Sequence, residues 1–252
     1  SEYTKNGGFY EFSFSVVAPH QMKDKVSAVL SAEYEGEAYT SAVSEYSIYT
    51  YCEGQINKES SKATLKTLLV DILNYGSAAQ NYKGYKTNDL ANANLTEEQK
   101  ALGNQEVLDY KDEKILNNTV PENGIANIRA VGLALQDSVE VTFMFELFAG
   151  ESLDGVTAHI EAIGKSWDIE ASEFTFDKSY GYYVISFKEL NPAQMREVIK
   201  VSLVKDGTVV SDTGIYSIES YSFSSAVKAD NTLKALVDAM ARYGRSAKAY
   251  NG

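Results

Sequence analysis

The residues of this chain best suited to bind a ligand are aromatic side chains in two short stretches of its second half. Trp167, the only tryptophan, lies in "GKSWDIE", a stretch typical of a hairpin turn. Tyr180 lies in "DKSYGYY", where charged residues again flank the rings. Such rings stack on the flat faces of a ligand such as a sugar, and neighbouring polar groups bond to its hydroxyls. The candidate ligand-binding residues are Trp167, Tyr180, Tyr182, Tyr183, Lys165, Asp168, Asp177 and Lys178.

Two questions about these rings stay open at the level of sequence. Trp167 is either a ligand platform or an ordinary packing residue, since a tryptophan at a turn is costly to leave in water without use. Side chains alternate along a strand, so only one of Tyr182 and Tyr183 can face a core.

The sequence gives little support to enzymatic or metal-binding chemistry. Acidic residues such as Glu146 and Glu161 are abundant, but carboxylates alternating along strands are typical of a solvent-exposed face rather than of a glycosidase pair. The two histidines, His20 and His159, lie far apart and lack the spacing of metal ligands. No G-x-S-x-G, P-loop or G-x-G-x-x-G motif is present. We therefore expect no catalytic residue, no metal site and no cofactor.

Composition narrows the class of partner. The chain has 35 acidic and 23 basic residues and a net charge of -12, which disfavours nucleic acid and anionic lipid. No run of 18 apolar residues is present, so we expect no membrane insertion. The single cysteine, Cys52, excludes an intrachain disulfide. The first residues lack the features of a signal peptide, and we expect a soluble piece excised from a longer protein.

A long pattern occurs twice in the sequence. Residues 46–82 and 216–250 share tyrosines at matching positions, and "PHQMKDKV" upstream of the first copy matches "PAQMREVI" upstream of the second. Still further upstream, "GGFYEFSF" matches "GYYVISF". One unit therefore reads as a strand, a Pro-X-Gln-Met turn, two strands and two helices. The matched aromatic pairs are Tyr46/Tyr216, Tyr51/Tyr221, Tyr75/Tyr243, Tyr82/Tyr250 and Phe14/Phe187.

The repeat also separates shared residues from those specific to one copy. We expect aromatic residues present in both copies to serve a common core, and those present in one copy to be freer to contact a ligand. Two further ligand candidates follow from this comparison. Tyr49 is matched by Glu219 in the second copy, and Tyr85 lies just beyond the first helical stretch.

Hydrophobic periodicity predicts the strands. Apolar residues alternate from Val139 to Leu147, and again at Phe12, Phe14 and Val16, as in half-buried antiparallel strands.

A spacing of three to four predicts two long helices, over residues 65–82 and 233–250, the second capped by Asp230 or Asn231. Gly76 and Gly244 lie inside these helices, where glycine costs about 1 kcal/mol relative to alanine. Their presence in both copies predicts a close contact with another backbone or ring.

The pattern as a whole predicts an α+β fold of two related units, each an antiparallel β-sandwich or partial sandwich followed by a pair of helices. The first lobe spans 1–88, a linker spans 89–125 and the second lobe spans 126–252. A capping box from Thr96 to Gln99 predicts a short helix in the linker. Extra strands between Asn127 and Phe176 have no counterpart before Gly7, so either the chain starts inside its first sandwich or the first lobe is smaller.

The repeated ends "LLVDILNYGSAAQNY" and "LVDAMARYGRSAKAY", together with the strand-rich segments before them, resemble modules of secreted surface proteins of gut Clostridia and ruminococci. The starch adherence system proteins of ruminococcal amylosomes are the nearest family in this resemblance, which spans most of the chain. It implies a non-catalytic module that captures α-1,4-glucan in a groove of two lobes. It also implies secretion or display on the surface of a Gram-positive bacterium.

We therefore expect a carbohydrate-binding module for starch or maltooligosaccharides, within a larger surface protein or complex. The alternative is a structural or adhesion module whose exposed tyrosines contact a protein partner. A glycoside hydrolase is a more distant third possibility.

Overall fold

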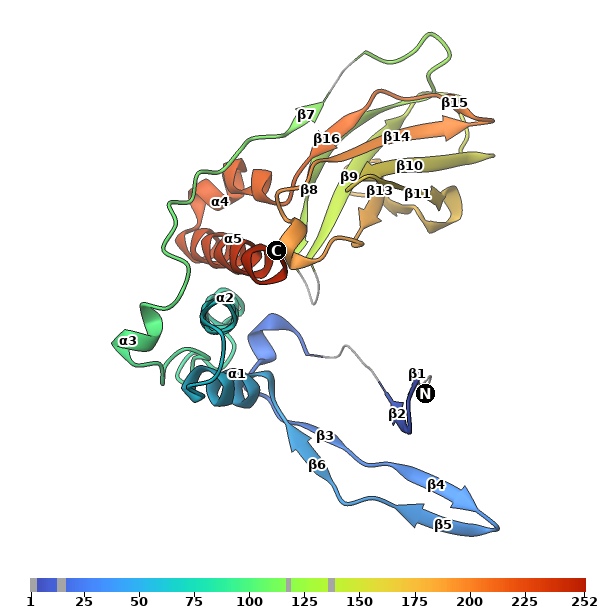
Figure 1. Cartoon of the computed structure of the whole chain (residues 1–252). Coiled ribbons are helices and arrows are strands. Elements are labelled where there is room, and N and C mark those ends of the chain that lie inside the picture. Colours follow the sequence, from blue (N-terminus) through green and yellow to red (C-terminus); the bar gives the residue numbers. More distant parts are fainter. Residues whose placement is uncertain (1–3, 13–16, 117–118, 136–138) are drawn as a thin grey trace.

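The computed structural model describes residues 4–12, 17–116, 119–135 and 139–252 (Figure 1). Helices and antiparallel strands occur in separate stretches of the chain, so the predicted α+β class is confirmed. Phe14 and Val16, two residues of a predicted strand, lie outside the described residues. Among the described residues, no helix combines the length and the hydropathy that a membrane crossing requires.

Two antiparallel sheets make up most of the second half of the chain (Figure 1). The first has the order β11 (Lys165–Glu170), β10 (Val156–Ala162), β14 (Ile199–Lys205), β16 (Gly214–Tyr216) and β7 (Ile115–Leu116), with β15 (Thr208–Val209) beside β14. The second has the order β12 (Thr175–Asp177), β13 (Tyr182–Phe187), β9 (Val139–Leu147) and β8 (Ala126–Leu135).

The alternation predicted for this region produces the core. Phe143 and Phe145 of β9 and Ile160 of β10 are fully buried and belong to one hydrophobic cluster, although the two strands lie in different sheets. The inner faces of the sheets therefore share a core, an arrangement compatible with a β-sandwich. A bulge between Ile128 and Ala130 shifts the register of β8 on β9.

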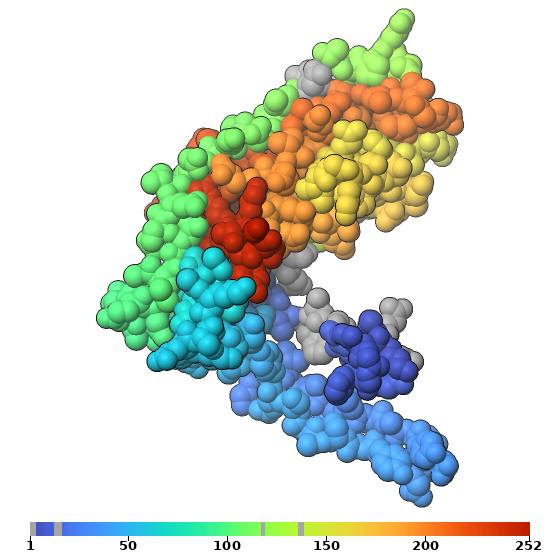
Figure 2. Space-filling view, in the orientation of Figure 1, coloured from blue at the N-terminus to red at the C-terminus, as the bar shows by residue number. Residues whose placement is uncertain are grey.

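Among the described residues, the strands of the first part pair in twos. The pairs are β1 (Thr4–Asn6) with β2 (Phe9–Glu11), β3 (Val26–Ala28) with β6 (Ser44–Tyr46), and β4 (Ser31–Tyr34) with β5 (Glu37–Thr40). Nearly all of their residues are exposed. Figure 2 shows these strands, in blue, standing away from the sheets drawn in yellow and orange. The sandwich expected in the first lobe is therefore not confirmed among the described strands.

Two of the helices begin at caps that the sequence predicts. They are α1 (Ile48–Asn57), α2 (Ala63–Lys83), α3 (Glu97–Lys100), α4 (Ser225–Ala229) and α5 (Asn231–Asn251), with single 3₁₀ turns η1 (Pro19–Gln21), η2 (Ala171–Glu173), η3 (Pro192–Gln194) and η4 (Glu219–Phe223). The Thr96–Gln99 capping box is present in α3, and the Asp230 side chain accepts hydrogen bonds from the first amides of α5. In the second copy of the repeat, the first of the two predicted helices is replaced by the 3₁₀ turn η4 and the short helix α4.

Gly76 and Gly244 make the close contacts that the repeat predicts. A Cβ atom at Gly76 would lie 2.6 Å from Sδ of Met22 and 3.3 Å from the carbonyl oxygen of Pro19. A Cβ atom at Gly244 would lie 3.0 Å from Sδ of Met195 and 2.9 Å from the carbonyl oxygen of Pro192. In each copy the helix therefore packs its glycine directly on the Pro-X-Gln-Met turn.

The two long helices α2 and α5 pack against each other and join the two halves of the molecule. The rings of Tyr75 and Tyr243 stack at 5.7 Å between centroids, with 20° between their planes. Tyr75 belongs to the same hydrophobic cluster as the inner faces of the sheets. The expectation that matched aromatics serve a core is therefore confirmed for this pair and for the buried Tyr216. It is wrong for Tyr46, Tyr51 and Tyr250, which are 55%, 42% and 45% exposed.

Candidate functional site

Trp167 lies in a strand and not in a turn. It is part of β11, opposite Ile160 of β10, and the turn itself falls at Ile163 and Gly164, both of which have positive φ. The indole ring is half-buried and meets the ring of Phe187 edge to face, at 5.0 Å between centroids. The prediction that Trp167 lies in a turn is therefore wrong. The residue lies in a strand, and its indole ring packs against the edge of the core.

The exposed Tyr180 and the half-buried Tyr182 form an aromatic pair on the β12–β13 hairpin. Their ring centroids lie 6.4 Å apart with 18° between the ring planes, and Tyr180 is 70% exposed. Tyr183 instead points inward and stacks on Phe145 at 5.4 Å. The alternation expected from the sequence thus holds, with Tyr183 as the core residue.

The hairpin turn that carries Tyr180 is fixed by its own hydrogen bonds. The amide of Ser179 donates to Oδ1 of Asp177 at 2.8 Å, and the amide of Gly181 donates to the carbonyl oxygen of Asp177 at 2.8 Å. Gly181 has φ of +73°, a conformation that favours glycine. The exposed Lys178 lies within the same turn. Tyr180, Tyr182, Asp177 and Lys178 therefore lie in or directly beside one short turn held by hydrogen bonds.

The other charged candidates belong to the opposite sheet. Lys165 and Asp168 lie on β11, which is an edge strand of the first sheet. Oδ1 of Asp168 lies 2.7 Å from Nδ1 of His159 on the neighbouring strand. Lys165 lines an open hollow of about 530 Å³ with Glu161 at the end of the β10–β11 hairpin. These residues do not form part of the Tyr180 turn.

Tyr49 and Tyr85 lie in the helical half of the molecule, and both hydroxyls are engaged there. The Tyr49 hydroxyl donates to Glu53 at 2.7 Å, and burial together with this carboxylate raises the pKa of Tyr49. The Tyr85 hydroxyl donates to Oδ2 of Asp24 at 2.6 Å. We therefore assign these two tyrosines to the fold rather than to the Tyr180 turn.

A polar hollow on the outer face of the first sheet was not singled out from the sequence. It measures about 330 Å³ and is lined by polar and aliphatic side chains of β10, β14 and the strand beside them, including His159, Lys200 and Ser202. None of the residues that line it is a phenylalanine, tyrosine or tryptophan, so it offers hydrogen bonds without a large stacking platform. The alternating segment "GVTAHIEA" is the signal that could have indicated this face.

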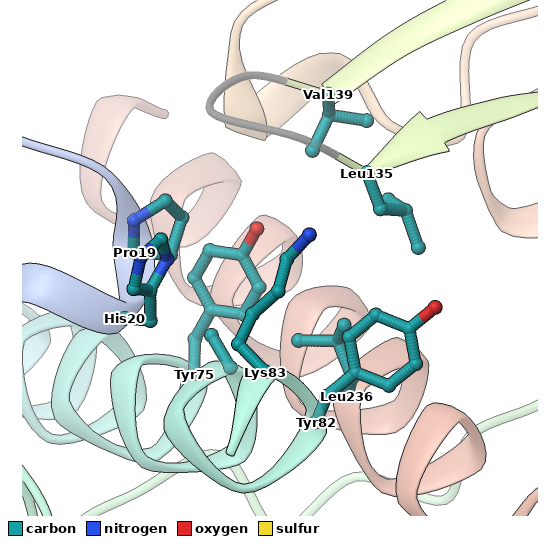
Figure 3. Close-up of a pocket in the computed structure, with 9 residues that line it drawn as sticks. Pro19, His20, Tyr75, Tyr82, Lys83, Leu135, Val139 and Leu236 are labelled. Atoms are coloured by element: carbon teal, nitrogen blue, oxygen red, sulfur yellow. The ribbon is translucent and has the colours of Figure 1, made fainter. Parts of the chain in front are cut away.

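Figure 3 shows a small apolar pocket between η1, the two long helices and the ends of β8 and β9, lined among others by Pro19, Tyr75, Leu135 and Leu236. Its free space of about 20 Å³ is close to that of one water molecule. Burial raises the pKa of Tyr75 to about 12, so its hydroxyl stays protonated. A pocket of this size has no room for a sugar and is best read as a gap in packing.

No cluster of three or more histidine, cysteine, aspartate or glutamate side chains suited to a metal ion occurs in the part of the chain that the structure describes. Comparison of the chain with protein-family models, with curated proteins and with solved structures finds no match.

Proposed function

We propose that this protein is a non-catalytic glycan-binding module whose ligand is α-1,4-glucan, that is, starch or maltooligosaccharides. The observation that carries the proposal is the nearly parallel ring pair of the exposed Tyr180 and the half-buried Tyr182 on the β12–β13 hairpin. Aromatic pairs of this kind suit the apolar faces of sugar rings, because tyrosine side chains are large, rigid and amphipathic.

The surroundings of the ring pair support a sugar ligand. Asp177 and Lys178 lie in the same turn, where a carboxylate and an ammonium group are placed to bond to sugar hydroxyls. The turn is held by hydrogen bonds to Asp177, so little conformational entropy is lost when a ligand binds. Trp167 is not needed in this site, since its ring is used in packing.

The choice of α-1,4-glucan follows from the resemblance of the repeated segments to starch adherence system proteins. The same resemblance supports a secreted or cell-surface location in a Gram-positive bacterium, as part of a larger assembly. The non-catalytic assignment is supported by the position of the carboxylates near the site. Asp177 is the carboxylate of the turn, and its Oδ1 accepts a hydrogen bond from the Ser179 amide, a structural use that leaves Oδ2 as the oxygen for a sugar hydroxyl.

Gel electrophoresis in the presence of amylopectin, of xylan or of no polysaccharide tests the proposal. We expect amylopectin to retard the protein, and removal of the platform in Tyr180→Ala/Tyr182→Ala to abolish the retardation. In calorimetric titration with a long maltooligosaccharide, loss of one stacked ring weakens binding by about 1–3 kcal/mol, or roughly 5- to 150-fold. Tyr34→Ala is the matched control, because Tyr34 is an equally exposed tyrosine on another hairpin.

Equal migration in all three gels would overturn the proposal. Retention of binding in the double variant would place the site elsewhere. Incubation with maltooligosaccharides should release no shorter sugars, and new reducing ends that increase with time would refute the non-catalytic assignment.

A further inference from the structure

An open apolar groove lies on the paired strands β3 and β6. Its walls come from both strands, from the two residues that follow β6 and from Val17, and its volume is about 190 Å³. The residues that line it are Val17, Val26, Ala28, Ser44, Tyr46, Ser47 and Ile48. Leu30, just beyond β3, is 58% exposed and extends the apolar surface. An apolar hollow on exposed strands is unusual for a surface without a partner.

The sequence repeat identifies the counterpart of this groove in the second half of the chain. Val26, Ala28 and Leu30 correspond to Ile199, Val201 and Leu203 of β14, at a constant offset in the sequence. Those three residues of β14 are completely buried. The two halves thus share the same strand pattern. Its apolar side chains are buried in the second half and partly or fully exposed along the groove in the first half.

The neighbours of β14 show what covers such a surface. Strand β10 pairs antiparallel with β14 and sets Ile160 directly opposite Val201. From the facing sheet, Cδ1 of Ile128 lies 3.1 Å from the position that a Cβ atom would take at Gly214. Apolar side chains of extended strands therefore fill the place that corresponds to the open groove.

The backbone of β3 offers the matching edge. Whereas β14 pairs with β10 on one side and β16 on the other, β3 pairs only with β6 among the described strands. An unpaired edge beside an apolar hollow is the geometry used when a protein adds an extended segment of a partner to its own sheet.

We propose that the β3 edge and its groove form a docking site for an extended strand of a partner protein. The strand runs antiparallel to β3 and carries apolar side chains at alternate positions, as β10 does along β14. A branched apolar side chain of the partner, equivalent to Ile160, lies opposite Ala28. This site is separate from the Tyr180 turn and does not depend on the glycan-binding proposal.

Charge specifies the partner strand further. The β4–β5 hairpin continues from β3 and exposes three carboxylates near its tip, those of Glu33, Glu35 and Glu37. In the antiparallel orientation, the N-terminal end of the partner strand approaches this acidic tip, as Val156 approaches Lys205 in the second half. The preferred partner therefore has basic residues before its apolar alternation.

The test uses a labelled peptide and the whole chain. The peptide has the β10 sequence Val156–Ala162 preceded by two lysines, and fluorescence anisotropy measures its binding. A second peptide carries aspartate at the position of Ile160. In the protein, Ala28→Arg puts a charge in the groove, and Ser27→Arg is the matched control because the adjacent side chain points to the opposite face. Both positions are exposed, and circular dichroism checks that both variants keep the fold.

We expect saturable binding of the first peptide, at least about tenfold weaker binding of the aspartate peptide, and at least about tenfold weaker binding to Ala28→Arg. Ser27→Arg should stay within about twofold of the unaltered protein. The proposal fails if no saturable binding occurs, or if both arginine variants bind equally. It also fails if light scattering shows that the chain self-associates and that Ala28→Arg abolishes this, because a second copy would then occupy the groove.

Discussion

Two buried charged side chains fix the course of the segment that connects the two halves. The Asp71 carboxylate accepts hydrogen bonds from the Asn104 amide at 3.0 Å and from the Ser246 hydroxyl, and burial raises the pKa of this carboxyl. Arg245 donates to the carbonyl oxygen of Val107 at 2.8 Å and to Asp109 at 3.0 Å. Residues 104–109 are therefore held along the helices by specific polar contacts, although the sequence reads there as a polar linker.

Asp24 gives a pH-dependent prediction. Partial burial opposes its ionisation, but hydrogen bonds from Lys86 and Tyr85 outweigh that effect and lower its pKa below the usual 3.8. A lowered pKa in the folded state gives stability that is present above pH 3.8 and is lost as the pH falls through the folded-state pKa. We expect Asp24→Asn to be less stable than the unaltered protein at pH 7, with a difference that shrinks below about pH 4.

Urea denaturation at pH 7, 5, 4 and 3 measures this difference. Tyr85→Phe removes one of the two donors and should show a smaller loss with the same pH dependence. A loss in Asp24→Asn that stays constant from pH 7 to pH 3 would show that packing, and not charge, accounts for it.

At the scale of elements, the Pro-X-Gln-Met turn occurs twice, as η1 and as η3, with the same contacts. The side chain of Gln21 accepts a hydrogen bond from the amide of Ala18 at 3.2 Å, and that of Gln194 accepts one from the amide of Asn191 at 3.0 Å. The glutamine thus closes each turn. The methionine that follows meets the glycine of the long helix. In both copies the glutamine therefore closes the turn, and the methionine packs the turn against the helix glycine.

The glycine contact yields a stability prediction. In Gly244→Ala the new methyl group would lie 2.9 Å from a backbone oxygen and 3.0 Å from a sulfur atom, so the turn must shift. We expect a loss of about 1–3 kcal/mol in the free energy of unfolding, which urea denaturation measures. Gly54→Ala in α1 is the matched control, because nothing lies within 4 Å of the new methyl group. The control should gain up to about 1 kcal/mol from helix propensity. Equal gains in both variants would contradict the close contact.

At the scale of the whole molecule, the α2–α5 contact couples the two halves. The stacked rings of Tyr75 and Tyr243 lie at its centre, and Tyr75, Met240 and Phe143 belong to one hydrophobic cluster. Because this cluster is shared, the helices and the sheets should lose their packing together rather than in separate steps.

The single tryptophan makes this coupling measurable. Trp167 reports on the sheets, whereas circular dichroism at 222 nm reports mainly on the helices. We expect the two signals to give the same urea midpoint, and Tyr243→Ala to lower both midpoints equally, with a loss of about 3 kcal/mol. Tyr250→Ala is the control, because Tyr250 is exposed near the end of the same helix. Two separate midpoints would mean that the halves unfold independently.

Much of the architecture could be predicted from the sequence because it depends on local chemistry. Residue type and spacing alone predict the Thr96–Gln99 box and a cap at Asp230 or Asn231, and the structure has the box and the cap at Asp230. Strand β9 was identified from its alternation. The paired glycines predicted close contacts, because glycine inside a helix is costly without a reason.

The tertiary structure decided what each ring contacts. Tyr46 and Tyr216 occupy matching positions, yet the first is 55% exposed and the second 2% exposed, because among the described residues only the second belongs to the large hydrophobic cluster. Likewise Trp167 packs on Phe187, a neighbour twenty residues away, and Tyr180 stays in water. Local sequence sets caps, turns and alternation, whereas burial depends on which distant strands come to lie over a face, and no short-range pattern contains that information.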